Sequence, residues 1–335
     1  MPDTARIMDI NTEPDPPKIK LGVSACLLGE PVRYDGNHKR HSFLTDVLAA
    51  YVDYLPVCPE AGVGMGIPRP PIQLVGQPGK VRALGVDNPA MDVTDRLLGY
   101  AQQQCRTLTT ISGYIFKKDS PSCGLGKVKL FKRPGHDMQR KGTGVYADTL
   151  VHAAPLLPVT EEDCFDDPKK RSHFLEQAYT YRRWQELTGS GVTTRLLLGF
   201  HATHRYLIMA HSLAAYHKLG KLLGNLPEQP LKAVSESYIS MLMQTLKRPS
   251  QQRQCSSVLQ RIANDLKQEL SSAEHASLIA SVEGYLAGSN DLFSFIKVLN
   301  QMVCRNPRPD NAVQLFLHPY PESLQNVAQG AVSGN

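Results

Sequence analysis

The chain has 335 residues, of which 41% are hydrophobic and 20% charged, a composition that excludes a fibrous or wholly disordered protein. This length exceeds that of a typical single core, so two domains are expected. The formal net charge of +6 is modest and by itself identifies no partner. No apolar run is long enough to cross a bilayer, and no signal peptide is visible at the N-terminus.

Residues 1–17 are polar, contain Asp15-Pro16-Pro17, and predict a disordered leader. From Lys18 onward, strand-like runs alternate with helical ones. The predicted strands are residues 20–24, 54–57, 113–116 and 128–131, and the predicted helices are residues 42–51, 94–108 and 146–153. This alternation predicts an α/β domain over residues 18–160, Rossmann-like, with a central and mostly parallel sheet. Residues 62–79 are rich in Gly and Pro and predict a loop.

The pattern changes near Thr160, which has the residue type of a helix N-cap and is followed by three acids. From there to about residue 306 the spacing of apolar residues is helical, clearest over residues 173–187 and 193–223. We therefore expect an all-α domain over residues 161–322. The polar residues 323–335 predict a flexible tail.

Three predicted strands each end in a cysteine that stands beside turn residues. Ser24 leads into Cys26, Val57 precedes Cys58, and the third strand leads into Ser-Pro-Ser-Cys123-Gly. Because the carboxyl ends of parallel strands meet at one edge of a sheet, these three side chains are expected to converge on one site.

Thiolates are soft ligands, so a site of three cysteines favours an iron–sulfur cluster, zinc or copper(I). The chain has no paired Cys-x-x-Cys, which counts against structural zinc. Three ligands on a cubane cluster would leave one iron open to substrate as a Lewis acid. The alternative is that they are buried core cysteines.

Four others stand in helical contexts and are predicted to be structural: Cys105, Cys164, Cys255 and Cys304. The seven cysteines together, odd in number and widely spaced, indicate a reducing compartment and hence a cytoplasmic location.

Two polar residues close to the cysteines suit acid–base chemistry. Glu60 lies two residues after Cys58, and Ser120 lies three residues before Cys123. Glu60 can activate a water and Ser120 can donate a hydrogen bond. The alternative is that both are ordinary loop residues.

Basic residues are concentrated in the second half of the chain. Residues 169–261 hold fourteen Lys or Arg against four acids, with aromatic residues interleaved. A second basic run spans residues 127–141. Such stretches suit a nucleic-acid surface or, alternatively, a solvated helix face. The candidate RNA contacts are Arg182, Arg183, Arg195 and Arg205.

Three histidines of the second domain fall on one helical face. His201, His204 and His211 are spaced by three and seven residues, which permits a metal site, although packing or phosphate-contacting roles are the preferred interpretation.

The motifs Ser-Ala-Cys26-Leu-Leu-Gly, Arg33-Tyr-Asp-Gly, Cys58-Pro-Glu and Ser120-Pro-Ser-Cys-Gly, in this order, resemble the thiouracil desulfidase (TudS-like) family over residues 18–158. The remainder resembles the YbgA-type helical domain through Phe200-His-Ala-Thr-His, Met209-Ala-His-Ser and His318-Pro-Tyr-Pro. It departs from that domain in having Arg205 where a Lys often follows the second His.

The combination is similar to two-domain desulfidases that remove 4-thiouridine from tRNA. The resemblance implies a [4Fe–4S] cluster held by Cys26, Cys58 and Cys123, with Glu60 and Ser120 as catalytic residues. It also implies tRNA as the partner, the thione sulfur binding at the open iron, and water replacing sulfur at C4 to give uridine. It implies neither a membrane nor an obligate protein partner. Two alternatives stay open, a desulfidase of free thiolated bases or nucleosides and a non-catalytic iron–sulfur redox sensor.

Overall fold

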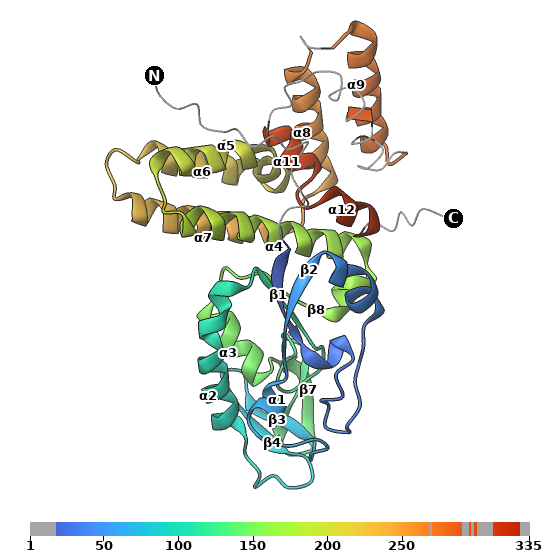
Figure 1. Ribbon diagram of the computed structural model, residues 1–335, viewed down its shortest axis with the longest axis vertical. Helices are drawn as coiled ribbons and strands as arrows, with labels where there is room; N and C mark the ends of the chain where they lie inside the picture. Colours follow the sequence, from blue (N-terminus) through green and yellow to red (C-terminus); the bar gives the residue numbers. More distant parts are fainter. Residues whose placement is uncertain (1–17, 268–269, 290–294, 296–297, 300–310, 329–335) are drawn as a thin grey trace. The chain divides into compact units, whose positions relative to one another are not determined.

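A computed structural model describes residues 18–328, apart from residues 268–269, 290–294, 296–297 and 300–310 (Figure 1). The predicted leader, residues 1–17, lies outside this range, as does Cys304. The described residues form two compact units, one made of residues 18–172 and 321–328 and the other of residues 173–320. Among the described helices, none combines the length and the hydrophobicity of a bilayer-spanning segment.

The first unit is built on a sheet of four parallel strands. These are β1 (Ile19–Ser24), β2 (Val52–Val57), β5 (Gly113–Phe116) and β8 (Val159–Glu161), in the order β2-β1-β5-β8. Every residue of β5 is buried, as is all but one of β1, which is typical of central parallel strands covered on both faces. The predicted α/β class with a parallel sheet is confirmed.

The strand connections contain the helices of this unit. The predicted helix over residues 42–51 is present as two short helical segments, a π-helical one over Phe43–Val47 and a 3₁₀-helical one over Leu48–Ala50. The four-residue α1 (Pro59–Gly62) follows β2. The helices α2 (Thr94–Gln104) and α3 (Val145–Ala153) pack against each other, as Figure 1 shows.

A second four-stranded sheet was not expected from the sequence. It consists of β3 (Ile72–Gln77), β4 (Lys80–Gly85), β6 (Val128–Arg133) and β7 (His136–Gly142) in the order β4-β3-β6-β7. The loop prediction for residues 62–79 is therefore wrong at β3. The many Gly and Pro residues there shape the turns around a short apolar strand, and Gly76, at a φ of +128°, lets the β3–β4 hairpin approach itself closely. One apolar core, including Leu74, Leu97 and Val145, joins this sheet to α2 and α3.

The prediction of Thr160 as a helix N-cap is also wrong. Thr160 lies in β8 opposite Ile115, and the long helix α4 (Pro168–Gly189) begins later. Asp167 caps α4, because its Oδ1 accepts the backbone N–H groups of Lys169 (2.9 Å) and Lys170 (3.3 Å), while Pro168 takes the first helical position.

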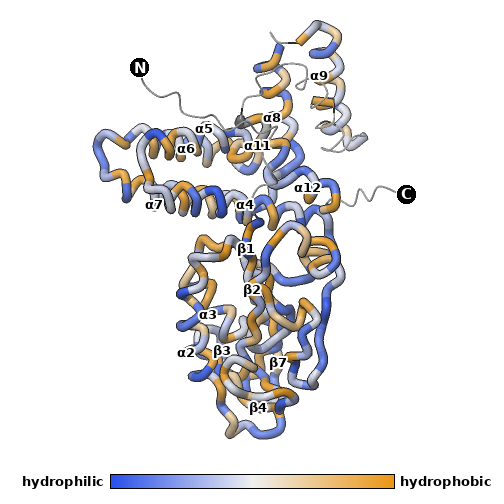
Figure 2. Tube along the Cα trace, in the orientation of Figure 1, coloured by the Kyte–Doolittle hydropathy of each residue, from blue (hydrophilic) through white to orange (hydrophobic). Residues whose placement is uncertain are grey.

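The second unit is helical in its described residues. After α4 come α5 (Thr194–His211), α6 (Leu213–Gly224), α7 (Leu231–Leu246), α8 (Gln252–Asp265), α9 (Ser272–Leu286) and α11 (Asn311–Leu317). The helical run predicted over residues 193–223 is interrupted at Ser212, whose hydroxyl caps α6 by accepting the N–H of Ala215. Hydrophobic and hydrophilic residues alternate along these helices in Figure 2, as in amphipathic helices around a core.

The predicted flexible tail begins with a helix. Residues 322–328 form α12 (Glu322–Ala328), and Leu324 and Ala328 are buried. These residues belong to the first unit.

The loop that carries Cys123 is fixed by the beginning of α3. Carbonyl groups of Pro121, Ser122 and Gly124 accept N–H groups from Val145, Ala147 and Gly144 at 3.2, 3.1 and 2.8 Å. The loop therefore satisfies donors of the first helical turn, which have no partner within the helix itself.

We predict that Gly144→Ala lowers the free energy of unfolding by about 1–3 kcal/mol through overpacking. A Cβ at Gly144 would lie 2.4 Å from the carbonyl carbon of Ser122 and 2.6 Å from the N atom of Cys123, both backbone atoms that cannot rotate away. The φ of −60° suits alanine, so backbone strain makes no contribution. Urea denaturation measures the effect.

The matched control is Gly99→Ala within α2, where a Cβ meets no atom within 4 Å. This change should stabilise the protein by up to roughly 1 kcal/mol, because alanine favours a helix interior over glycine. Equal stability of the Gly144→Ala protein and the wild type would show that α3 does not hold the loop tightly.

Candidate active site

The three cysteines predicted to converge line one cavity at the carboxyl edge of the parallel sheet. Cys26 follows β1, Cys58 follows β2, and Cys123 lies on the loop after β5. The cavity has a volume of about 480 Å³, and Glu60, Arg69 and Ser120 also line it. The convergence follows from strand order, because β2, β1 and β5 are adjacent and parallel.

The three thiols lie in a buried environment and influence one another. Burial, and next the neighbouring Cys58, raise the pKa of the Cys26 thiol to about 11. Burial also raises the pKa of Cys58, and it raises that of Cys123 well above the usual range, although a hydrogen bond from Ser24 opposes the shift. All six described cysteines are free. Neutral, clustered thiols of this kind become thiolates when a metal group supplies positive charge.

Glu60 is held in place by two donors. Its Oε2 accepts Nε of Arg69 at 2.8 Å, and its Oε1 accepts the hydroxyl of Ser122 at 2.8 Å. The side chain is 13% exposed and Arg69 only 3%, so this ion pair is largely shielded from water. Both carboxyl oxygens of Glu60 therefore act as acceptors of charged or buried donors, and the side chain is held in one orientation.

Arg69, Ser122 and Ser24 were missed by the sequence analysis. Arg69 lies in the Gly- and Pro-rich stretch that was predicted to be a loop. The one unusual feature of its sequence is that a charged residue stands between Pro68 and Pro70-Pro71. Ser122 lies within the motif Ser120-Pro-Ser-Cys-Gly, and nothing in the sequence separates its role from that of Ser120.

Ser120 organises the cysteine loop. Its Oγ accepts the backbone N–H groups of Ser122 at 3.2 Å and Cys123 at 3.1 Å. Because both contacts use the oxygen as acceptor, the hydroxyl proton can still be donated into the cavity that Ser120 lines.

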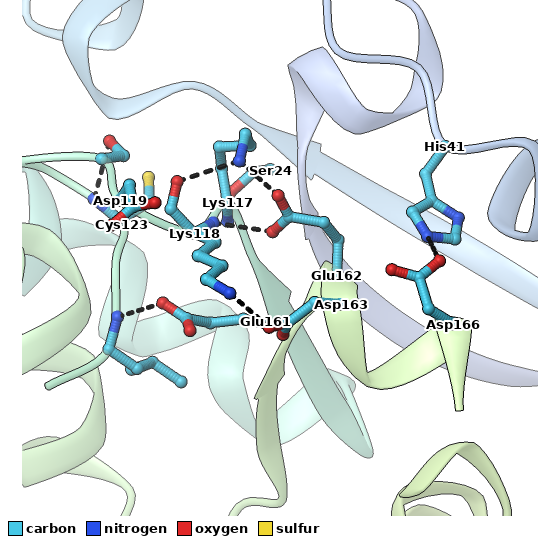
Figure 3. Close-up of polar contacts among 12 residues, drawn as sticks. Ser24, His41, Lys117, Lys118, Asp119, Cys123, Glu161, Glu162, Asp163 and Asp166 are labelled. Carbon is cyan, nitrogen blue, oxygen red and sulfur yellow. Dashed lines mark hydrogen bonds and ion pairs between the residues drawn. The ribbon is translucent and has the colours of Figure 1, made fainter. Parts of the chain in front are cut away.

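The acids predicted to begin a helix instead bind the strand-to-loop segment that precedes Cys123 (Figure 3). Glu162 pairs with Lys117 and accepts the N–H of Lys118 at 2.7 Å, and Asp163 pairs with the Lys118 ammonium at 2.6 Å. Glu161 accepts the N–H of Leu125 at 2.7 Å. Residues 161–163, at and after the end of β8, thus bind the segment 117–125 that carries Cys123.

Four basic side chains and one exposed aromatic ring also line the cavity. These are Arg33, Lys117, Lys118 and Lys129, together with Tyr34, which is 43% exposed. Three of the cations have acidic partners, because Arg33 pairs with Asp35, Lys117 with Glu162 and Lys118 with Asp163. The Arg33 guanidinium lies 5.4 Å from the centroid of the Tyr34 ring, which offers a flat apolar face.

The four candidate RNA contacts differ in their surroundings. Arg195 is exposed, and Arg182 forms an exposed ion pair with Glu186 at 2.8 Å. Arg205 lies over the Tyr206 ring at 4.4 Å. Arg183 faces inward, because Nη2 donates to the Pro319 carbonyl at 2.6 Å and Nη1 is closed off from solvent. The guanidinium of Arg183 is therefore not presented to a phosphate.

The three histidines of α5 have separate partners. His201 contacts the Tyr238 hydroxyl, His204 the Phe200 carbonyl, and His211 the Glu176 carboxylate at 2.7 Å. Burial lowers the pKa of His204 to about 3, so its ring is neutral. Within the described residues, no group of His, Cys, Asp or Glu is arranged to hold a single metal ion. Packing is the role that these contacts support.

Two protein-family models match the chain. One, described as 2-thiouracil desulfurase, covers residues 21–162, and the other, described as a protein of unknown function (DUF1722), covers residues 205–321.

Individual proteins match the same two regions. The uncharacterized protein YbgA of Escherichia coli (strain K12) is 24% identical over 121 residues, which are 36% of this chain and 72% of that protein. A solved structure of the [4Fe-4S]-dependent thiouracil desulfidase TudS is 33% identical, and the match covers 44% of this chain and 92% of that one with a TM-score of 0.36.

Proposed function

Because the chain belongs to the 2-thiouracil desulfurase family, with a YbgA-like helical domain following, we propose that it is a desulfidase that converts 4-thiouridine in tRNA to uridine. The observation that carries the proposal is one cavity lined by three cysteines from three adjacent strand ends, with a clamped carboxylate beside them.

Cys26, Cys58 and Cys123 would hold a [4Fe–4S] cluster, the cofactor on which the 33% identical desulfidase TudS depends. The donor set fits, since it offers three clustered thiols. When bound, such a cluster supplies a Lewis-acidic iron without a protein ligand, able to accept a thione sulfur.

Glu60 is the general base of the proposed reaction. Each of its oxygens accepts one hydrogen bond and keeps a further acceptor position for a water. The carboxylate takes a proton from that water as the oxygen adds to C4 of the base. The Ser120 hydroxyl donates to the pyrimidine and orients it. Sulfur leaves as sulfide and no net electron is transferred, so the reaction needs no redox partner.

Binding of tRNA would begin on its phosphates. A base inside folded tRNA must be turned outward to reach the cavity, at a cost of a few kcal/mol. Cationic contacts supply free energy for this step, and the exposed Arg195 and the half-exposed Arg182, which pairs with Glu186, are the candidates on the helical unit. The Tyr34 ring that lines the cavity offers a face on which the turned-out base can stack.

A second candidate is the desulfuration of free thiolated bases. It is favoured by the relative named for thiouracil and by the fact that every cavity residue lies in the first unit. The two functions differ in salt dependence, because phosphate contacts release counterions and a neutral free base makes none.

We predict that Cys26→Ser, Cys58→Ser and Cys123→Ser each lose most of the bound iron after anaerobic reconstitution, because each removes one of only three ligands. Iron and sulfide per chain and the visible absorption measure the cluster. Cys105→Ser is the control and should keep full iron, since Cys105 does not line the cavity. Full iron in any of the three variants would contradict the ligand assignment.

We predict that Glu60→Gln keeps the iron but lowers turnover about 10²–10⁴-fold, the usual cost of losing a general base. Ser120→Ala should also lower turnover with the cluster retained, by removing the donor to the pyrimidine. Sulfide release under single-turnover conditions is the readout. Near-normal rates with intact clusters would return both residues to structural roles.

The substrate assignment is tested by sulfide release from thiolated tRNA and from free 4-thiouracil. Arg182→Glu and Arg195→Glu should weaken tRNA binding, and each lost phosphate contact should reduce the slope of log K against log salt by about 1. Turnover of the free base should not change.

Lys80→Glu reverses an exposed charge at the first residue of β4, which does not line the cavity, and serves as the control. If the arginine variants bind and process tRNA like this control, the helical unit does not hold the RNA. If no thiolated substrate yields sulfide from iron-loaded protein, the desulfidase function itself is wrong.

A further inference from the structure

Arg69 is a buried charge to which the mechanism above assigns no part. Only 3% of its side chain is exposed, yet it lines the cavity. Removing a guanidinium from water costs several kcal/mol unless its donors are satisfied, so its contacts indicate what the site requires of it.

The guanidinium joins the carboxylate to two loops. Nε donates to Oε2 of Glu60 at 2.8 Å, Nη1 to the Gly66 carbonyl at 3.1 Å, and Nη2 to the Val32 carbonyl at 2.9 Å. Nη2 also lies 3.8 Å from Sγ of Cys58. The backbone N–H of Arg69 donates to the carbonyl of Tyr34 at 2.8 Å.

These contacts fix the orientation of the Glu60 carboxylate. Arg69 holds one oxygen and Ser122 holds the other, so rotation about the terminal bond of the side chain breaks both hydrogen bonds. The carbonyl contacts of Nη1 and Nη2 in turn hold the guanidinium, so Glu60 is positioned by a group that is itself immobile. A displacement of about 1 Å at a reacting group can cost 10²-fold in rate.

We propose that Arg69 is a positioning residue, which directs the Glu60 carboxylate at the attacking water and acts on the reaction through Glu60. This role rests on the proposed function. It differs from a merely structural role, in which Arg69 would stabilise the loops whatever residue stands at position 60.

A double-mutant cycle in the full-length, iron-loaded protein separates the two roles. The four proteins are the wild type, R69K, E60Q and R69K/E60Q, and the readouts are iron per chain, visible absorption, kcat and KM for 4-thiouracil. Lysine keeps the charge but cannot reach Glu60, Gly66 and Val32 together, because it lacks the planar fork of donors.

We expect R69K to keep iron and absorption, to lower kcat roughly 10- to 100-fold and to change KM little. In the E60Q background the same substitution should change kcat by less than about twofold, because the group that Arg69 positions is already gone. R82K is the matched control, since Arg82 also pairs with an acid, Asp92, but is 54% exposed. It should leave kcat unchanged.

A second variant covers the case in which R69K does not fold. S122A removes the other donor to Glu60 and replaces a fully buried hydroxyl by a smaller group. Its loss of kcat should likewise disappear in the E60Q background.

The positioning role would be overturned if R69K lowered kcat by the same factor in the wild-type and E60Q proteins, or if the kcat of R69K equalled that of the wild type. Either result would leave the desulfidase function intact. An iron-loaded wild type that releases no sulfide from any thiolated substrate would overturn both.

Discussion

The parallel pairing of β2, β1 and β5 is the constraint on which the site depends. Strands that run in one direction end at one edge, and each of these three leads into a segment that carries a cysteine. The three cysteines are remote in sequence and none of them forms a local motif with another. Any change that shifts the register of one strand would therefore displace one thiol relative to the other two.

The strand ends alone do not fix the cysteine loops, and two further sets of contacts do so. The first turn of α3 donates to the carbonyls of residues 121–124, and the carboxylates of residues 161–163 bind residues 117–125. On the opposite side of the cavity, Arg69 ties Glu60 to Val32 and Gly66. Charged groups can lie this close to an apolar interior because each has a partner, which offsets the cost of desolvation.

Sequence patterns predicted the parts of this arrangement that arise from local composition. The strands ending near Cys26, Cys58 and Cys123, their convergence, and the change from α/β to helical structure were all found from apolar runs and turn residues. The β3–β4 hairpin was not, because its short apolar run is surrounded by glycines and prolines. The start of α4 was misplaced to Thr160, since a cap and a strand residue look alike until pairing partners are known.

Residues whose role depends on a distant partner were the hardest to predict. Arg69 meets Glu60 only in the folded chain, and its sequence context gives no indication of this. Arg183 was taken for a surface cation because it stands in a basic stretch, whereas its direction is set by the contact with the Pro319 carbonyl. Charge density along a sequence does not specify which face of a helix a side chain occupies.

The carboxylates at residues 161–163 also bear on the order of biosynthesis. Residues 161–163 come late in the sequence of the first unit. Glu161 is the last residue of β8, and β8 can pair with β5 only after β8 has left the ribosome. The cysteine loop therefore reaches its final conformation late in the synthesis of this unit. Cys26, Cys58 and Cys123 are all translated before residues 161–163, so a nascent chain that ends short of Glu161 carries the three thiols without the contacts that hold the Cys123 loop.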